Sequence, residues 1–187
     1  MGIPVHFKRV RIAYTPYLFT PRPATERITK ERYGVALFWP KESPYTQEVL
    51  DALEQVTALS WPKYRPTLVS PLMDGDKPNS KGGSSGLEGH YFINAYRQIS
   101  QRAPMVLGRD AHPINASHPD APYPGCYVNA LVDFYADTTH QKLCIGLTTV
   151  QSYGYGTHMG GSDPAATLSQ FSAITDEALD EALQGML

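Results

Sequence analysis

Two strand-like runs, residues 127–136 and 142–151, constrain the fold more than any other part of the sequence. In the first run, apolar residues occupy every second position and would share one face of a strand: Val128, Ala130, Val132 and Phe134. Strict alternation over this length is typical of a half-buried β-strand. The short linker "DTTHQ" between the runs predicts that the two strands form a hairpin.

Other segments also have the composition of strands. We predict strands at residues 8–14, 31–40 and 89–97, and a short strand within residues 104–114. Segment 8–14 would place Val10, Ile12 and Tyr14 on one face. Residues 15–25 contain three prolines and are expected to be a loop.

Residues 43–60 have the clearest helical pattern. Ser43 can cap the helix and Pro44 would occupy its first position. The predicted apolar stripe consists of Val49, Leu50, Leu53, Val56 and Leu59. Five or six strands, one substantial helix and long loops favour a mostly β fold, in which a small barrel packs against one helix.

Charge is divided unevenly along the chain. Residues 1–109 hold 15 Lys and Arg against 9 Asp and Glu, whereas residues 110–187 hold one basic and 9 acidic residues. The asymmetry indicates a basic binding surface and a separate acidic segment, unless the fold interleaves the two halves. Residues 174–187 contain four acidic residues and no basic ones. They would form either a terminal helix packed on the barrel or a mobile acidic tail.

No motif predicts a catalytic, metal or cofactor site. The glycine-rich stretches lack the spacing of a phosphate-binding loop or a dinucleotide fingerprint. Asp74 and Asp76 could bind a metal, but a tight turn explains "DGD" more simply. We therefore expect a non-enzymatic protein. The alternative is a metal-dependent nuclease or phosphodiesterase that uses these carboxylates and nearby histidines.

Aromatic and basic residues occur together along much of the chain. The sequence holds 12 Tyr, 6 Phe and 2 Trp, many of them in mixed stretches such as "KRVRIAYTPYLF" and "WPKYRP". Bases stack on exposed rings, at about 1–3 kcal/mol per base, and basic side chains attract phosphates. In segment 89–97, Phe92, Asn94 and Tyr96 would face away from the core. This face would be a stacking platform for single-stranded nucleic acid, unless a helix or loop covers it.

Several ordered motifs resemble those of a known family. "PLMDGD", "GHYFINAYR", "APMVLGRDAHPI", "YPGCYVNALVDFYA" and "KLCIGLTTVQ" occur in the order seen in a family of bacteriophage single-stranded-DNA-binding proteins. The match runs from about Arg9 to about Gly161. The resemblance implies an OB-fold, which is a five-stranded barrel with inserted loops and a helix. It also implies a role in phage DNA replication or recombination, with an acidic tail that contacts polymerase or other replication proteins.

We predict the DNA-binding residues from their chemistry. The phosphate contacts would be Lys8, Arg9, Arg11, Arg32, Lys63, Arg65, Arg97 and Arg102. The stacking residues would be Tyr17, Phe19, Tyr33, Tyr64, Phe92, Tyr96, Tyr127 and Tyr135. Asn94 and Asn129 would hydrogen-bond to sugar or base without fixing a sequence. Loop 74–89, with Lys77 and Lys81, would close over the strand.

The predicted organisation is an OB-fold domain over residues 1–161, followed by a linker and acidic tail over residues 162–187. No apolar run approaches the length that spans a bilayer, so we expect no membrane association. The expected location is the cytoplasm of the infected bacterium. A structural phage protein is a further alternative, and the sequence leaves open whether the chain forms a homodimer.

Overall fold

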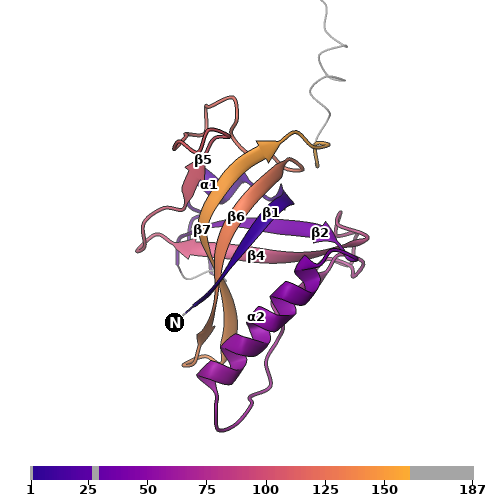
Figure 1. The fold of residues 1–187 in the computed structure, drawn as a ribbon, viewed down its shortest axis with the longest axis vertical. Helices are drawn as coiled ribbons and strands as arrows, with labels where there is room; N and C mark the ends of the chain where they lie inside the picture. The colour runs from indigo at the N-terminus through magenta and orange to yellow at the C-terminus, as the bar shows by residue number, and fades with distance from the viewer. Residues whose placement is uncertain (1, 27–29, 161–187) are drawn as a thin grey trace, which may run out of the picture.

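The computed structural model describes residues 2–26 and 30–160, so the predicted acidic tail lies outside the described residues. The fold is mostly β, as predicted. Five strands form a barrel: β1 (Ile3–Ala13), β2 (Arg32–Pro40), β4 (His90–Gln98), β6 (Tyr127–Asp137) and β7 (Lys142–Gly154). Figure 1 shows β2 and β4 crossing the long β6–β7 hairpin.

The sheet closes on itself at a single residue pair. Neighbouring strands in the order β4-β2-β1-β6-β7 are antiparallel, and β4 returns to β7 in parallel through Tyr96 and Gly146. Two short strands extend the ring: β3 (Met73–Asp74) pairs with β4, and β5 (Met105–Leu107) pairs with β7. The closed five-stranded ring agrees with the predicted OB-fold architecture.

The barrel interior is filled by the alternating residues of the strands. The four inward positions predicted for β6 are all buried: Val128, Ala130, Val132 and Phe134. The predicted hairpin is confirmed, since β6 and β7 pair from Tyr127 opposite Gly154 to Asp137 opposite Lys142.

Strand β1 is longer than predicted and irregular. It begins at Ile3, and its register with β6 shifts between Phe7 and Val10, where Arg9 has a φ of 56°. Val10 and Ile12 are buried as predicted, but the placement of Tyr14 beside them is wrong. Tyr14 follows the end of β1 with a φ of 55°, and this left-handed backbone turns its side chain outward, so that it is 59% exposed.

The predicted helix is confirmed as α2 (Tyr45–Ser60), which packs against β1, β6 and β7 (Figure 1). Pro44 takes the N-cap position predicted for Ser43, although the Ser43 hydroxyl accepts a 3.3 Å hydrogen bond from the Tyr45 N–H. The predicted stripe is partly wrong, because Leu50 and Leu59 are exposed. The buried face of α2 comprises Val49, Ala52, Leu53, Val56 and Thr57.

The proline-rich stretch predicted as a loop contains a one-turn helix, α1 (Pro16–Phe19), with proline in its first turn. Leu18 anchors α1 in the core. Neither helix in the described part of the chain has the length and apolar character needed to span a bilayer.

Candidate nucleic-acid interface

Two grooves meet on the outer side of β4. The first has a volume of about 900 Å³, and its lining includes polar and apolar side chains and the Asp74 carboxylate. Its rings and cations are Tyr14, Tyr17, Tyr33, Phe92, Tyr96, Arg22, Arg32 and Lys77. The second, of about 870 Å³, runs toward the tip of the β6–β7 hairpin and includes Lys30, Tyr135, His140 and Lys142. Both grooves share Arg32, Met73, Asn94 and Tyr96. A strand lying in one groove can therefore continue into the other.

The junction of the grooves is built from an aromatic ring, a guanidinium and a glycine. Gly34 of β2 pairs with Tyr96 of β4, and a Cβ at residue 34 would lie only 2.7 Å from the Tyr96 ring. The missing side chain at Gly34 thus lets the ring lie across β2. The guanidinium carbon of Arg32 lies 3.8 Å from the centre of this ring, within cation–π range.

No carboxylate in the described part of the chain pairs with the cations of the first groove. Within the described residues, Arg22, Arg32 and Lys77 form no ion pair, and the buried Nε of Arg32 has no hydrogen-bond partner. The guanidinium of Arg22 lies over the Tyr17 ring, 5.7 Å from its centre. Unpaired cations beside partly exposed rings are what a single-stranded polyanion with stacking bases requires.

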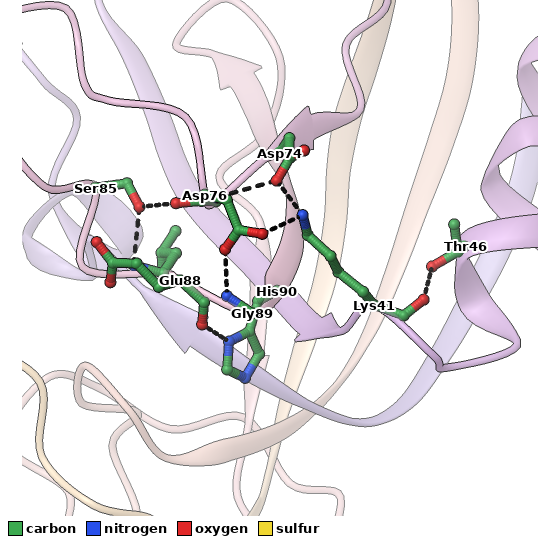
Figure 2. A network of polar contacts seen from close by, with 10 residues as sticks. Lys41, Thr46, Asp74, Asp76, Ser85, Glu88, Gly89 and His90 are labelled. Atoms are coloured by element: carbon green, nitrogen blue, oxygen red, sulfur yellow. Dashed lines mark hydrogen bonds and ion pairs between the residues drawn. The ribbon is translucent and has the colours of Figure 1, made fainter.

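Asp74 and Asp76, the carboxylates of the alternative nuclease, are paired with the same ammonium group. Figure 2 shows the Lys41 ammonium between them, 2.5 Å from an oxygen of each. The Asp76 carboxylate also accepts a 2.7 Å hydrogen bond from the Gly89 N–H. The Lys41 hydrogen bond holds the pKa of Asp74 below its usual value, while the Gly89 N–H and then Lys41 lower the pKa of Asp76. This geometry favours the tight-turn interpretation, and the described residues hold no cluster of three metal-ligating side chains.

Loop 74–89 folds back against the barrel. Gly75 is packed so closely that a Cβ there would lie 2.0 Å from the Leu87 carbonyl oxygen. Leu87 is buried against Ala36 and Phe38 on the outer side of β2. The loop therefore forms one wall of the first groove, with Lys77 at its lining, and it covers the Phe38 ring.

A separate group of rings and cations lies on β1, β6 and β7. The guanidinium carbon of Arg9 is 5.9 Å from the Tyr127 ring centre and 6.0 Å from that of Tyr153. The Arg9 N–H donates a 3.0 Å hydrogen bond to the Asn129 side-chain oxygen, and the Asn129 amide in turn donates to Gln151. We call Arg9, Tyr127 and Tyr153 the β1 patch; they line neither groove.

The structure brings some of the predicted site residues together and separates others. Those that line a groove are Tyr17, Arg32, Tyr33, Phe92, Asn94, Tyr96 and Tyr135. Those that line neither groove are Lys8, Arg9, Arg11, Phe19, Lys63, Tyr64, Arg65, Arg97, Arg102, Tyr127 and Asn129.

Several residues of the second set have contacts within the protein. Arg11 donates hydrogen bonds of 2.9 and 2.8 Å to the Gly125 and Thr157 carbonyls. Arg97 donates to the carbonyls of Arg102 and Leu147. Arg65 pairs with Glu54, and Phe19 packs against the core.

Sequence reasoning missed three groove residues. Arg22 and Lys30 lie outside the regular elements, and only their position near other rings and cations could have pointed to them. Tyr14 was assigned to the core face of a predicted strand, but it lies beyond the end of β1. Tyr153 of the β1 patch could have been found, because it occupies an outward position near the end of an alternating strand.

Comparisons with known proteins identify a family and relatives of this chain. The family described as "Enterobacter phage Enc34, ssDNA-binding protein" matches residues 3–183. A relative from Acyrthosiphon pisum secondary endosymbiont phage 1, "Putative protein p50", is 26% identical and aligns over 96% of this chain and 98% of its own.

Two solved structures share the fold. The single-stranded DNA-binding protein of bacteriophage Enc34 in complex with ssDNA has a TM-score of 0.67 at 18% identity, covering 84% of this chain and 89% of that chain. Gp2.5, a single-stranded DNA binding protein encoded by bacteriophage T7, has a TM-score of 0.56 at 14% identity, covering 89% and 94%.

Proposed function

We propose that this chain binds single-stranded DNA, because it belongs to the family of the single-stranded-DNA-binding protein of Enterobacter phage Enc34. It would do so without strong sequence preference, during phage DNA replication or recombination. Its proposed part is to hold the strand rather than to cleave it.

The observation that carries the proposal is the junction at Arg32 and Tyr96. A guanidinium that forms no ion pair with a described residue lies on a ring that is 37% exposed, where two grooves meet. A base would stack on the accessible part of the Tyr96 ring, and Arg32 would contact the adjoining phosphate. The buried Nε of Arg32, which has no partner in the described structure, leaves that guanidinium less firmly held than one in an ion pair.

The remaining groove residues extend this contact along the strand. Tyr17, Tyr33, Phe92 and Tyr135 would stack further bases, Arg22 and Lys77 would contact phosphates, and Asn94 would hydrogen-bond to a sugar or base. Every base has a π-face, so binding by stacking and phosphate contact tolerates any sequence. The other predicted contacts would need a strand that extends beyond the grooves. They are the contacts of Lys8, Arg11, Lys63, Tyr64, Arg65, Arg97, Arg102, Phe19 and Asn129.

The test is a titration of labelled single strands, duplex and RNA at two salt concentrations. We expect single-stranded DNA to bind most tightly, and log affinity to fall linearly with log salt concentration. Tyr96→Ala should weaken binding by about 1–3 kcal/mol, whereas Leu59→Ala, on the exposed side of α2, is the matched control.

Two outcomes would contradict the proposal. One is an affinity that does not depend on salt. The other is cleavage: the same DNA incubated with Mg²⁺ or Mn²⁺ should remain intact on a denaturing gel, and fragments lost in an Asp74→Asn variant would establish the nuclease instead.

The rest of the predicted organisation belongs to this proposal. Residues 1–161 would form the DNA-binding domain, and residues 162–187 a linker and acidic tail that contacts polymerase or other replication proteins. The protein would act in the cytoplasm of the infected bacterium. Light scattering with and without oligonucleotide would show whether it forms a homodimer.

A further inference from the structure

The β1 patch has features that the grooves do not explain. Arg9 has a φ of 56°, a left-handed conformation that is strained for a residue with a side chain. A β-bulge between Phe7 and Val10 creates this conformation, and bulges commonly re-aim a side chain. Here the bulge places the Arg9 guanidinium between the rings of Tyr127 and Tyr153, on two neighbouring strands.

Hydrogen bonds fix the backbone of the β1 patch, while its side chains stay accessible to solvent. The Asn129 side-chain oxygen accepts a hydrogen bond from the Arg9 N–H, and the Asn129 amide donates one to the Gln151 side chain. The bulge is therefore supported by a hydrogen-bonded pair of side chains on β6 and β7. Arg9 is exposed, Tyr153 is 48% exposed, and Arg9 forms no ion pair with a described carboxylate. A cation and rings kept available in this way match the chemistry of the groove junction.

The strand register relates the patch to the first groove. Phe92 of β4 lies opposite Phe38 of β2, Phe38 opposite Arg11 of β1, and Arg11 opposite Tyr127 of β6. Three strand spacings separate Phe92 from Tyr127, which is about 14 Å. Since phosphates of one strand follow each other every 3.4 Å or more along its axis, about four nucleotides or fewer cross this distance.

The surface between the first groove and the β1 patch has no exposed ring along this row of residues. Phe38, at the middle of this row, is 1% exposed because Leu87 and Met159 pack over it. The segment that carries Met159 is fixed by Arg11, which bonds to the Thr157 carbonyl, and by the Tyr123 ring, stacked on His158 at 4.0 Å. The patch and the groove are therefore two separate contact sites, not one continuous platform.

We propose that the β1 patch is a second contact site for the same single-stranded DNA, engaged only when the strand is long enough to leave the first groove. This inference rests on the proposed function. One base stacks on the Tyr153 ring, next to the Tyr127 ring. Arg9, which lies between the two rings, contacts the phosphate of the bound strand. Long strands are thus bound at the grooves and at the patch, and short strands at the grooves alone.

The test compares two lengths of labelled oligothymidylate, about 4 and about 16 nucleotides, which span the range of site sizes on a single OB-fold. A strand of about four nucleotides is used up by the distance between Phe92 and Tyr127, so it cannot occupy the grooves and the patch at once. Fluorescence anisotropy would measure the affinity of Arg9→Gln and Tyr153→Ala for each length. We expect each variant to weaken binding of the long strand by about fivefold or more, and of the short strand by less than about twofold. The slope of log affinity against log salt should fall by about one for Arg9→Gln on the long strand only.

Arg109→Gln is the charge-matched control, because Arg109 is exposed but already paired with Asp120 at 3.2 Å. Equal losses on both lengths, or no loss on either, would overturn the second site. Failure of the proposed function would look different: the wild-type protein would bind neither length. Retained affinity for the short strand also shows that each variant is folded.

Discussion

Replacing Gly34 by alanine should weaken DNA binding, although residue 34 is buried. The new Cβ would lie 2.7 and 3.0 Å from the Cδ1 and Cε1 atoms of Tyr96, and 3.5 Å from the Ala95 carbonyl oxygen. The first two distances are too short to persist. Since Tyr96 is 37% exposed, its ring can swing toward solvent and leave the backbone of β2 and β4 in place.

The displaced ring affects binding more than stability. Moving Tyr96 separates it from the Arg32 guanidinium, a contact of about 0.5–1 kcal/mol at an exposed site. Loss of this contact should lower the melting temperature by about 2–4 °C at most in a chain of this size. If the ring can no longer stack a base, binding loses about 1–3 kcal/mol, which is about a five- to 150-fold rise in Kd.

Anisotropy titrations of Gly34→Ala, Tyr96→Ala and the double variant would test this reasoning. Once the Tyr96 ring is absent, alanine at residue 34 meets nothing and should cause no further loss. The double variant should therefore bind like Tyr96→Ala alone, giving a strong coupling between the two sites. Additive losses would refute the reasoning, as would a Gly34→Ala variant that binds like the wild type while Tyr96→Ala is impaired.

Two further predictions concern stability. Lys41→Gln should lower the melting temperature at neutral pH, because Asp74 and Asp76 lose their ammonium partner. The folded-state pKa of both carboxylates is lowered, so their contribution to stability is present above their ordinary pKa near 4 and is lost as the pH falls below it. The variant should therefore lose less stability on acidification, and an unchanged acid dependence of the melting temperature would contradict the stabilising role of the Lys41 ion pairs. Phe134→Ala, which empties a fully buried position, should cost about 3–5 kcal/mol in urea denaturation, whereas Leu59→Ala, at 63% exposed, should change stability by about 0.5 kcal/mol or less.

The barrel strands could be predicted because their local pattern and their burial agree. Val128, Ala130, Val132 and Phe134 alternate in the sequence and alternate in the core. Helix α2 was recognisable for the same reason, but its exact face was not. Leu50 and Leu59 are as apolar as the buried residues of α2. Only the position of strands β1, β6 and β7 decides which side of the helix is covered.

The candidate site was harder to predict because it depends on contacts between distant segments. Arg32, Phe92 and Tyr96 were each selected from the sequence for their chemistry, yet nothing local places the Arg32 guanidinium on the Tyr96 ring. That contact requires the register of β2 against β4. Tyr14 was misplaced because its left-handed backbone interrupts an alternation that otherwise continues through β1.

The closure of the barrel has a mechanical consequence. Strands β2 and β4 are joined over nine residue pairs. Among the described residues, β4 and β7 share one backbone pair, Tyr96 with Gly146, beside which the Arg97 side chain bonds to the Leu147 carbonyl. This seam lies beneath the point where both grooves meet, and a sheet opens locally most easily where its backbone pairing is sparse. Under the proposed function, opening of the seam would shift the surface beneath the base that stacks on Tyr96.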